Sequence, residues 1–368
     1  MSCKRGQIDR YNGPPGGSGP FMRSPGSHSA VRTAVCVIAV SLLVCVAMMI
    51  SFASAAPEDE PFSVLVIHSY DQGFAWTDRQ NEGILDTFAG AEERLHVYVE
   101  YMDYRNYPDS RNLERFREYC LYKYADRGID IVITTDEVAL RFALDNRAEL
   151  FSDAPVVFSG VSESGAEEII AGRTGVTGVV EEIDPVGTVK AAFGINPGIR
   201  KIYVIFDDSA NSVRQGQSAV EAIKVYAAKA EVVALSISDT EKVLDSARNA
   251  EDDSIIIFSA LTAGNNSDMS GFKRFCAALG RESRVPVYHL YDIGLGNGAV
   301  GGSIVSGSTQ GEEAAKLALR ILEGEDVSEM PFATKNTTRY VFDYKVLQHF
   351  NIDTALLPPG SEIINKPG

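Results

Sequence analysis

Short aliphatic stretches alternate with longer amphipathic ones from Ser63 onward, and this alternation limits the fold more than any other feature of the chain. The first apolar runs are "SVLVIH", "LHVYVEYM", "DIVITT" and "PVVFSG". Strands buried on both faces have this near-continuous apolar character, and helices between them connect parallel neighbours. We therefore predict an N-terminal, doubly wound α/β lobe at residues 62–177, with helices at about Thr77–Gly90, Ser110–Arg127 and Asp136–Leu150.

The same cycle restarts after the glycine-rich stretch "GRTGVTGVVEE", which we expect to be a break between two lobes. Four more apolar runs follow, namely "KIYVIFD", "EVVALSI", "SIIIFSA" and "VPVYHLY". Predicted helices lie between them at about Ser209–Lys229, Thr240–Ala250 and Met269–Gly280. This pattern predicts a second α/β lobe at residues 178–291.

The chain after Tyr291 has the pattern of segments that cross back between two lobes. A glycine-rich stretch, "DIGLGNGAVGGSIVSGS", precedes a predicted helix at about Gln310–Leu322 and the strand-like "TRYVFDY". We assign residues 292–345 to crossover segments, and residues 346–368 to a short helix and a C-terminal tail. The predicted fold class is α/β, with two doubly wound parallel-sheet lobes joined by a multi-crossover hinge.

Residues 1–56 have the pattern of a disordered leader followed by an export signal. The uncharged run Ala34–Phe52 follows Arg23 and Arg32 and precedes "ASAAP", which offers a cleavage site near Ala55 or Ala56. The run also approaches the roughly 20 residues that span a bilayer, so an uncleaved membrane anchor is the alternative. Either Met1 or Met22 can be the start. We expect a periplasmic or otherwise extracytoplasmic protein.

The charge of the exported part excludes some partners. Loss of residues 1–56 removes five basic residues and one acid, which takes the formal charge from −16 to −20. Because no dense Lys/Arg patch interrupts this acidity, we expect no nucleic-acid partner. Cys120 and Cys276 remain; a disulfide is conceivable in an oxidising compartment, but two buried free thiols are favoured.

Polar groups follow the ends of several predicted strands. In open parallel sheets, ligands bind outside the carboxyl ends of the strands, so we expect a cleft where the two sheets face each other. Helices that begin there would favour an anion such as a carboxylate. The alternative for single members is a helix cap, as for Asp136 and Ser209, or a core aromatic. The candidate ligand-binding residues are His68, Ser69, Tyr70, Gln72, Trp76, Asp136, Glu137, Ser159, Gly160, Asp207, Ser209, Ser259, Tyr291 and Asp292.

Motifs for other chemistries fail on their context. "GNGAVG" matches G-x-G-x-x-G, but it leads into "GSIVSG", which has the pattern of extended chain rather than of a helix. No G-x-S-x-G elbow occurs, and the histidines lack metal-ligand spacing. We therefore expect no cofactor, no metal and no catalytic residue.

Several blocks together resemble the ABC transporter substrate-binding-like family, which has a periplasmic binding protein type 1 fold. They are "VLVIHSYDQGFAWTD", "VEYMDYRNYPD", "PVVFSGV", "TGVVEEIDPVGTV", "KIYVIFD", "PVYHLYDIGLGNGAVGG" and "FDYKVLQHFNIDTALLPPGSEIINKP". The resemblance implies two lobes that close over a small molecule, with amino acids, notably aromatic ones, among the ligands of relatives. Very similar domains are extracytoplasmic sensors of histidine kinases and diguanylate cyclases, where a transmembrane helix follows a block like "LPPGSEIINKP".

The leading hypothesis is an exported, non-enzymatic protein that captures a small molecule, such as an amino acid or another small carboxylate, for an ABC importer. Its partners would be the small-molecule ligand and an ABC permease. The alternative is a stand-alone ligand sensor that acts with a membrane-bound signalling protein, a separate histidine kinase or diguanylate cyclase. A third hypothesis is an exported enzyme that uses Asp136 and Asp207 as acid and base.

Overall fold

The structure, a computed structural model, describes residues 60–125, 127–206, 210–236, 240–259, 269–332 and 338–367. All of them belong to one compact unit, Glu60–Gly368. The predicted leader and the candidate residues Asp207 and Ser209 lie outside the described residues. Among the helices in the described ranges, none is both long and apolar enough to cross a membrane.

The N-terminal half forms a five-stranded sheet in which every pair of neighbours is parallel. The apolar runs that predicted its strands are buried, as in β1 (Phe62–His68), where the last five residues have no exposed surface. The strand order is β2 (Leu95–Tyr101), β1 (Phe62–His68), β3 (Ile131–Thr135), β4 (Val156–Val161) and β5 (Val176–Val180).

The C-terminal half forms a seven-stranded sheet that is parallel except between β10 (Gly301–Val305) and β11 (Thr338–Asp343). "GNGAVG" does lead into a strand, β10, rather than into a helix, as predicted. The strand order is β12 (Glu362–Ile364), β11 (Thr338–Asp343), β10 (Gly301–Val305), β9 (Val287–His289), β8 (Ser254–Phe258), β6 (Lys201–Phe206) and β7 (Glu231–Ser236).

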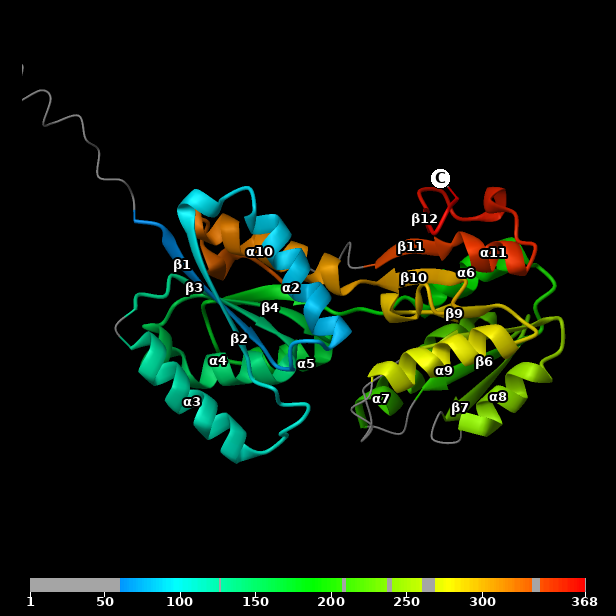
Figure 1. Ribbon diagram of the computed structural model, residues 1–368, viewed down its shortest axis with the longest axis horizontal. Helices are drawn as coiled ribbons and strands as arrows, with labels where there is room; N and C mark the ends of the chain where they lie inside the picture. Colours follow the sequence, from blue (N-terminus) through cyan, green and yellow to red (C-terminus); the bar gives the residue numbers. More distant parts are fainter. Residues whose placement is uncertain are drawn as a thin grey trace, which may run out of the picture. The chain divides into compact units, whose positions relative to one another are not determined.

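Helices cover both faces of each sheet, as a doubly wound fold requires (Figure 1). On the first sheet, one face packs against α3 (Ser110–Tyr124), α4 (Asp136–Phe151) and α5 (Glu163–Ile170), and the other against α2 (Ala75–Phe88) and α10 (Gly307–Leu322). On the second sheet, one face packs against α6 (Pro185–Ile195), α7 (Ala210–Ile223) and α11 (Tyr344–His349), and the other against α8 (Thr240–Arg248) and α9 (Met269–Glu282). Short 3-10 turns complete the loops at Glu92–Arg94, Lys224–Tyr226, Asp292–Gly294 (η3), Val327–Glu329 and Thr354–Leu356.

The predicted break at "GRTGVTGVVEE" was wrong, because residues 176–180 form β5, the edge strand of the first sheet. The glycine within β5, Gly178, is required for close packing between strands rather than for a turn. A Cβ on Gly178 would lie 2.4 Å from Cγ of Phe158 on the neighbouring strand β4. The chain leaves the first lobe only after Val180, and α6 follows in the second lobe.

Helix α10 returns to the first lobe and lies against α2, although more than 200 residues separate them (Figure 1). Glycines allow the two helix backbones to approach closely. A Cβ on Gly83 would lie 2.0 Å from the Ser308 carbonyl oxygen, and one on Gly311 would lie 2.0 Å from the Gln80 carbonyl oxygen. The chain thus passes between the lobes after β5, after β10 and after α10.

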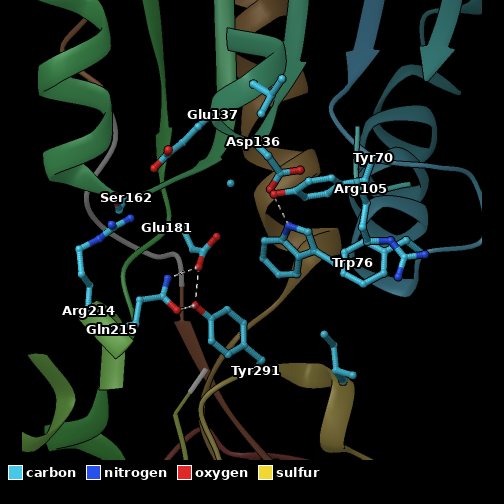
Figure 2. Close-up of a pocket in the computed structure, with 14 residues that line it drawn as sticks. Tyr70, Trp76, Arg105, Asp136, Glu137, Ser162, Glu181, Arg214, Gln215 and Tyr291 are labelled. Atoms are coloured by element: carbon cyan, nitrogen blue, oxygen red, sulfur yellow. Dashed lines mark hydrogen bonds between the residues drawn. The ribbon is translucent and has the colours of Figure 1, made fainter. Parts of the chain in front are cut away.

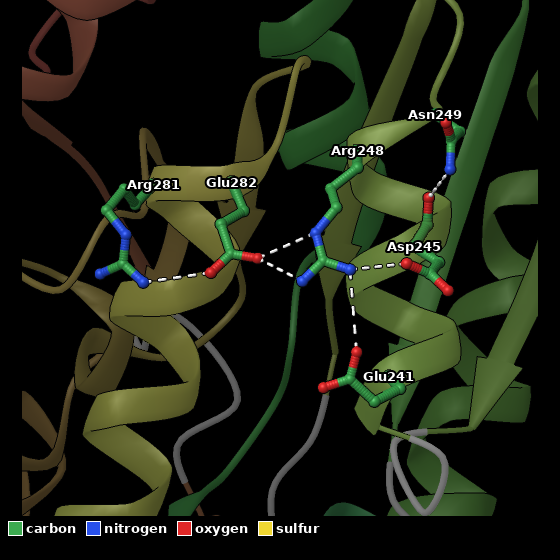
Figure 3. A network of polar contacts seen from close by, with 6 residues as sticks. All are labelled: Glu241, Asp245, Arg248, Asn249, Arg281 and Glu282. Carbon is green, nitrogen blue, oxygen red and sulfur yellow. Dashed lines mark hydrogen bonds and ion pairs between the residues drawn. The ribbon is translucent and has the colours of Figure 1, made fainter.

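A network of charged side chains connects α8 and α9, the two helices on one face of the second sheet (Figure 3). Arg248 on α8 donates to Glu282 on α9 at 3.0 Å through Nε and at 2.6 Å through Nη2. Within the two helices, Arg248 also donates to Asp245 and Arg281 donates to Glu282. Because most of these side chains are exposed, the network positions α8 against α9 more than it stabilises the fold.

The two cysteines of the predicted mature chain are buried free thiols, as favoured from the sequence. Cys120 lies on α3 and Cys276 on α9, in different lobes. Burial raises the pKa of the Cys120 thiol to about 12, so this group stays protonated and unreactive at neutral pH.

Candidate functional site

A cavity of about 280 Å³ lies between the two lobes (Figure 2). Its walls combine four aromatic rings, three carboxylates and two guanidinium groups with smaller polar and aliphatic side chains. The lining residues are Tyr70, Phe74, Trp76, Arg105, Asp136, Glu137, Val138, Gly160, Ser162, Glu181, Arg214, Gln215, Tyr291 and Ile293.

Each strand of the first sheet contributes to this lining at its carboxyl end. Tyr70 follows β1, Arg105 follows β2, Asp136 follows β3, Ser162 follows β4 and Glu181 follows β5. The second lobe contributes Arg214 and Gln215 from α7 and Tyr291 and Ile293 from the segment after β9. This arrangement is the one that open parallel sheets impose, because the loops at their carboxyl ends converge.

The aromatic walls meet where the two lobes come together. Trp76 on α2 contacts Tyr291 of the second lobe edge to face, with ring centroids 5.8 Å apart. Tyr70 contacts Phe74 in the same way at 5.6 Å. Trp76 and Phe74 are 5% and 6% exposed, so these rings belong to a small apolar cluster and to the cavity wall at the same time. A ligand with an apolar or ring-bearing body would find complementary surface here.

Asp136 is held in an unusual backbone conformation at the start of α4. Its φ of 67° lies in the left-handed region, which is strained for a residue other than glycine. Its carboxylate accepts a hydrogen bond from Trp76 Nε1 at 3.0 Å and a longer one from Gln80 Nε2 at 3.4 Å. Strain of this kind persists only where the surrounding structure imposes it, and it is common at functional sites.

Glu181 links the lobes through hydrogen bonds to two side chains of the second lobe. Its Oε1 accepts from the Tyr291 hydroxyl and from Gln215 Nε2, while the other oxygen points away from both donors (Figure 2). Burial raises the pKa of Glu181 to about 7, although these hydrogen bonds oppose the shift. Burial likewise raises the pKa of Asp136 to about 8, and the charge of Glu181 adds to that shift.

Arg105 presents one unpaired nitrogen at the wall of the cavity. Its Nε and Nη2 donate to the two oxygens of Asp71 at 2.9 and 3.1 Å, and its guanidinium carbon lies 4.7 Å from the Phe74 ring centroid. Nη1 is buried without a hydrogen-bond partner. A buried donor without an acceptor is energetically unfavourable, so an acceptor oxygen on a ligand would gain a hydrogen bond from Arg105 Nη1.

Six of the residues predicted from the sequence line the cavity: Tyr70, Trp76, Asp136, Glu137, Gly160 and Tyr291. Gly160 is close to the carboxylate, since a Cβ there would lie 2.8 Å from Asp136 Oδ1. The helix-cap alternative for Asp136 does not describe its role, because Asp136 is the first residue of α4 and its side chain faces Trp76 and Gln80.

Other predicted residues lie beside the cavity rather than in its wall. His68 stacks on Tyr101, and its ring nitrogens are within hydrogen-bond distance of Thr135 and Asn81. Burial lowers the pKa of His68 to about 4, so this ring is neutral at physiological pH. Ser69 Oγ accepts from the Ala139 backbone N–H and donates to the Thr135 carbonyl, which helps to fix the start of α4.

The remaining described candidates also have structural partners or point elsewhere. Ser159 donates to Gln80 Oε1, and Ser259 donates to the Ile205 carbonyl. Gln72 is exposed, and Asp292 forms an ion pair with Arg79 on α2. The strand-end rule therefore indicated the end of each sheet at which the cavity lies, but it could not tell which side chains turn outward into the cavity.

The residues that the sequence analysis missed are Phe74, Arg105, Val138, Ser162, Glu181, Arg214, Gln215 and Ile293. A usable signal existed for Arg105 and Ser162, because both follow the ends of recognised strands. Glu181 escapes prediction because it follows β5, which lies in a glycine-rich stretch that predicts a break rather than a strand. Gln215 lies within α7, and only the contact between lobes brings it to Glu181.

The fold is that of type 1 periplasmic binding proteins. A substrate binding protein from Clostridium difficile with adhesive properties, CD0873, in its ligand-free, open form, has a TM-score of 0.60 at 14% identity, over 83% of this chain and 100% of that one. An ABC domain in complex with L-Trp from Streptococcus pneumonia has a TM-score of 0.59 at 16% identity, over 83% of this chain and 100% of that one. An ABC transporter solute binding protein from Bacillus halodurans with bound myo-inositol has a TM-score of 0.51 at 12% identity, over 80% of this chain and 99% of that one.

The sequence assigns the family as well. Residues 126–356, more than half of the chain, match the family of ABC transporter substrate binding proteins. The chain belongs to this family, whose members are binding proteins, as its resemblance to them implied. No match to a curated protein sequence was found.

Proposed function

We propose that this protein is exported and captures a small molecule in the cavity between its lobes, without altering it chemically, and delivers it to an ABC permease. The observation that carries the proposal is the lining of the cavity, to which both lobes contribute side chains, among them Trp76 and Asp136 from one and Gln215 and Tyr291 from the other. A ligand that contacts both walls is bound most tightly when the lobes are closed around it.

The lining also supports the ligand class expected from the sequence, an amino acid or another small carboxylate. Arg105 and Arg214 are guanidinium groups that can bind a carboxylate, and the aromatic rings can enclose an apolar side chain. The Streptococcus protein of the same fold holds L-Trp, which is consistent with an aromatic ligand here. In keeping with the export proposal, we assign the protein to the periplasm or another extracytoplasmic compartment, either free after cleavage of the predicted signal or held by it as an anchor.

Trp76 offers a direct test, because it is the only tryptophan of the chain and lies in the cavity wall. Amino acids, amines, carboxylates and sugars would be titrated into the purified protein while Trp76 emission and melting temperature are recorded. A ligand at 100 times its Kd should shift the emission and stabilise the protein by about 2.7 kcal/mol. A Trp76→Phe variant is the optical control, since it should lose the fluorescence signal yet keep a thermal shift. If no compound class changes either quantity, solute binding is the wrong function.

The importer partner is tested separately from ligand binding. Cells that lack this protein should lose uptake of the ligand identified above. Intact uptake together with loss of a ligand-dependent kinase or cyclase response would instead support the sensor hypothesis from the sequence.

A further inference from the structure

The middle of the cavity is acidic and aromatic rather than basic. Asp136 and Glu181 reach it from the carboxyl ends of β3 and β5, with the rings of Trp76 and Tyr291 beside them (Figure 2). Three carboxylates line the cavity against two guanidinium groups, and one of the latter, Arg105, is paired through two hydrogen bonds with a further carboxylate, Asp71. The lining therefore carries an excess of negative charge when its acids are ionised.

The carboxylates of Asp136 and Glu181 lie in surroundings that disfavour their ionised forms, which lowers the stability of the empty protein. Asp136 is only 5% exposed and has a strained φ of 67°. The raised pKa values of Asp136 and Glu181 mean that ionising either group in the empty cavity costs free energy. A positive charge placed between them would remove much of that cost, whereas an anion would increase it.

We propose that the space between Asp136 and Glu181 is a subsite for a protonated amine, and that this ammonium group, more than any carboxylate, is what the protein recognises in its ligand. The inference rests on the proposed function, because it takes the cavity to be the ligand site. Aromatic rings attract ammonium groups through their negative faces, and the cavity has four such rings to surround one. The N-terminus of α4, which we expected to favour an anion, carries Asp136 and Glu137 in its first turn, and these carboxylates repel an anion there.

Binding of a cation in this subsite also releases protons. The ionisable groups that face Asp136 across the cavity and from the elements packed around it are Tyr70, Arg105, Glu137, Glu181, Arg214 and Tyr291. The ammonium ion favours the ionised form of Asp136 and Glu181, so protons that these groups hold in the empty protein pass to the solvent. Affinity for an amine should therefore rise with pH as it passes through about 7 and about 8, the raised pKa values of Glu181 and Asp136 in the empty protein, and level off above them.

Two matched ligand series test which charge is recognised. The first is tryptamine, L-tryptophan and indole-3-propionate, and the second is phenethylamine, L-phenylalanine and 3-phenylpropionate. Within each series one member lacks the carboxylate and one lacks the amine, while the ring is unchanged. We expect removal of the amine to weaken binding by about tenfold or more, and by more than removal of the carboxylate does. Titration calorimetry in buffers of different ionisation enthalpy should show proton release at pH 7.

Variants of the two carboxylates test whether Asp136 and Glu181 cause the preference for an amine and the proton release. Asp136→Asn and Glu181→Gln should each reduce amine affinity and proton release, while the affinity for the propionates should stay the same or rise, because a carboxylate that repels them is removed. Glu182→Gln is the matched control, since Glu182 is an exposed acid next to Glu181 that does not line the cavity. If one carboxylate variant fails to fold, the other still tests the subsite, and the ligand series needs neither.

The outcomes separate this inference from the proposed function. Propionates that bind as tightly as the amines would overturn the ammonium subsite and leave solute binding intact. If neither series binds while a compound without an amine, such as myo-inositol, does bind, the ammonium subsite is likewise overturned and solute binding stands. Absence of binding by every compound class would overturn both.

Discussion

At the scale of single residues, the site depends on a glycine that keeps space for a carboxylate. Gly160 has a φ of 68°, and a Cβ there would lie 2.8 Å from Asp136 Oδ1 and 3.0 Å from Gln80 Oε1. Because it has no side chain, Gly160 can adopt this left-handed backbone conformation, and it leaves room for the Asp136 carboxylate. Any larger residue must move the carboxylate that faces the cavity.

Gly160→Ala should lower both stability and ligand affinity. The left-handed backbone alone costs about 1–2 kcal/mol for alanine, and displacement of Asp136 adds to it. Gly172→Ala is the matched control, because Gly172 has a similar φ of 73° but nothing within 4 Å of its added Cβ. Urea denaturation of both variants would measure the difference. Equal losses of stability would contradict a steric role for Gly160.

At the scale of elements, the contact between α2 and α10 is what fixes Trp76. Helix α2 carries Trp76 and Gln80 toward Asp136. The same face of α2 packs against α10, where Gly83 lies against Ser308 and Gly311 lies against the Gln80 backbone. A Cβ on Gly307 would also lie 3.0 Å from the Trp76 carbonyl oxygen. A crossover helix from late in the chain thus supports the aromatic wall of the cavity.

Gly83→Ala should destabilise the protein, although alanine favours an isolated helix. Its Cβ would lie 2.0 Å from the Ser308 carbonyl oxygen, so the two helices must separate, and overpacking of this kind costs about 1–3 kcal/mol. Gly194→Ala in α6 is the control, since its nearest neighbour is 4.0 Å away, and it should leave stability unchanged or slightly higher. Thermal unfolding would distinguish them, and a Gly83→Ala variant as stable as Gly194→Ala would rule out the close packing.

At the scale of the whole molecule, polar contacts join the lobes around the cavity. Arg79 on α2 lies 2.8 Å from Asp292 in η3, and Tyr291 donates to Glu181 nearby. Asp292 is almost fully buried, with its Oδ1 lacking a hydrogen-bond partner, whereas Arg79 is half-exposed. The pair therefore holds the two lobes together at a modest gain in free energy.

Asp292→Asn should weaken ligand binding about two- to fivefold, the equivalent of the roughly 0.5–1 kcal/mol that a partly exposed ion pair contributes. The reason is that the charge pair stabilises the arrangement of lobes that forms the cavity. Asp252→Asn is the control, because its partner Arg284 lies in the same lobe and both side chains are exposed. Calorimetric affinities for any identified ligand would check this; equal affinities for the two variants would show that the interlobe pair plays no part.

The sequence by itself indicated two mainly parallel α/β lobes, because strands buried on both faces appear as apolar runs such as "VLVIH" and "SIIIF". It did not indicate that β10, β11 and β12, from the predicted crossovers and tail, complete the second sheet. It also indicated the end of each sheet where a ligand would lie, which brought Tyr70, Asp136 and Tyr291 into the prediction. Both inferences follow from neighbouring residues and the geometry of parallel strands.

Only the tertiary structure decided which of these polar groups line the cavity. His68 and Ser159 lie at strand ends like Asp136, yet their side chains form hydrogen bonds within the protein interior. Gln215, in contrast, reaches the cavity from within α7, a position with no distinguishing pattern. The direction of a side chain and the approach of α10 to α2 depend on contacts between segments far apart in the chain. Such contacts leave no periodic signal in the sequence, so they become visible only when the lobes are assembled.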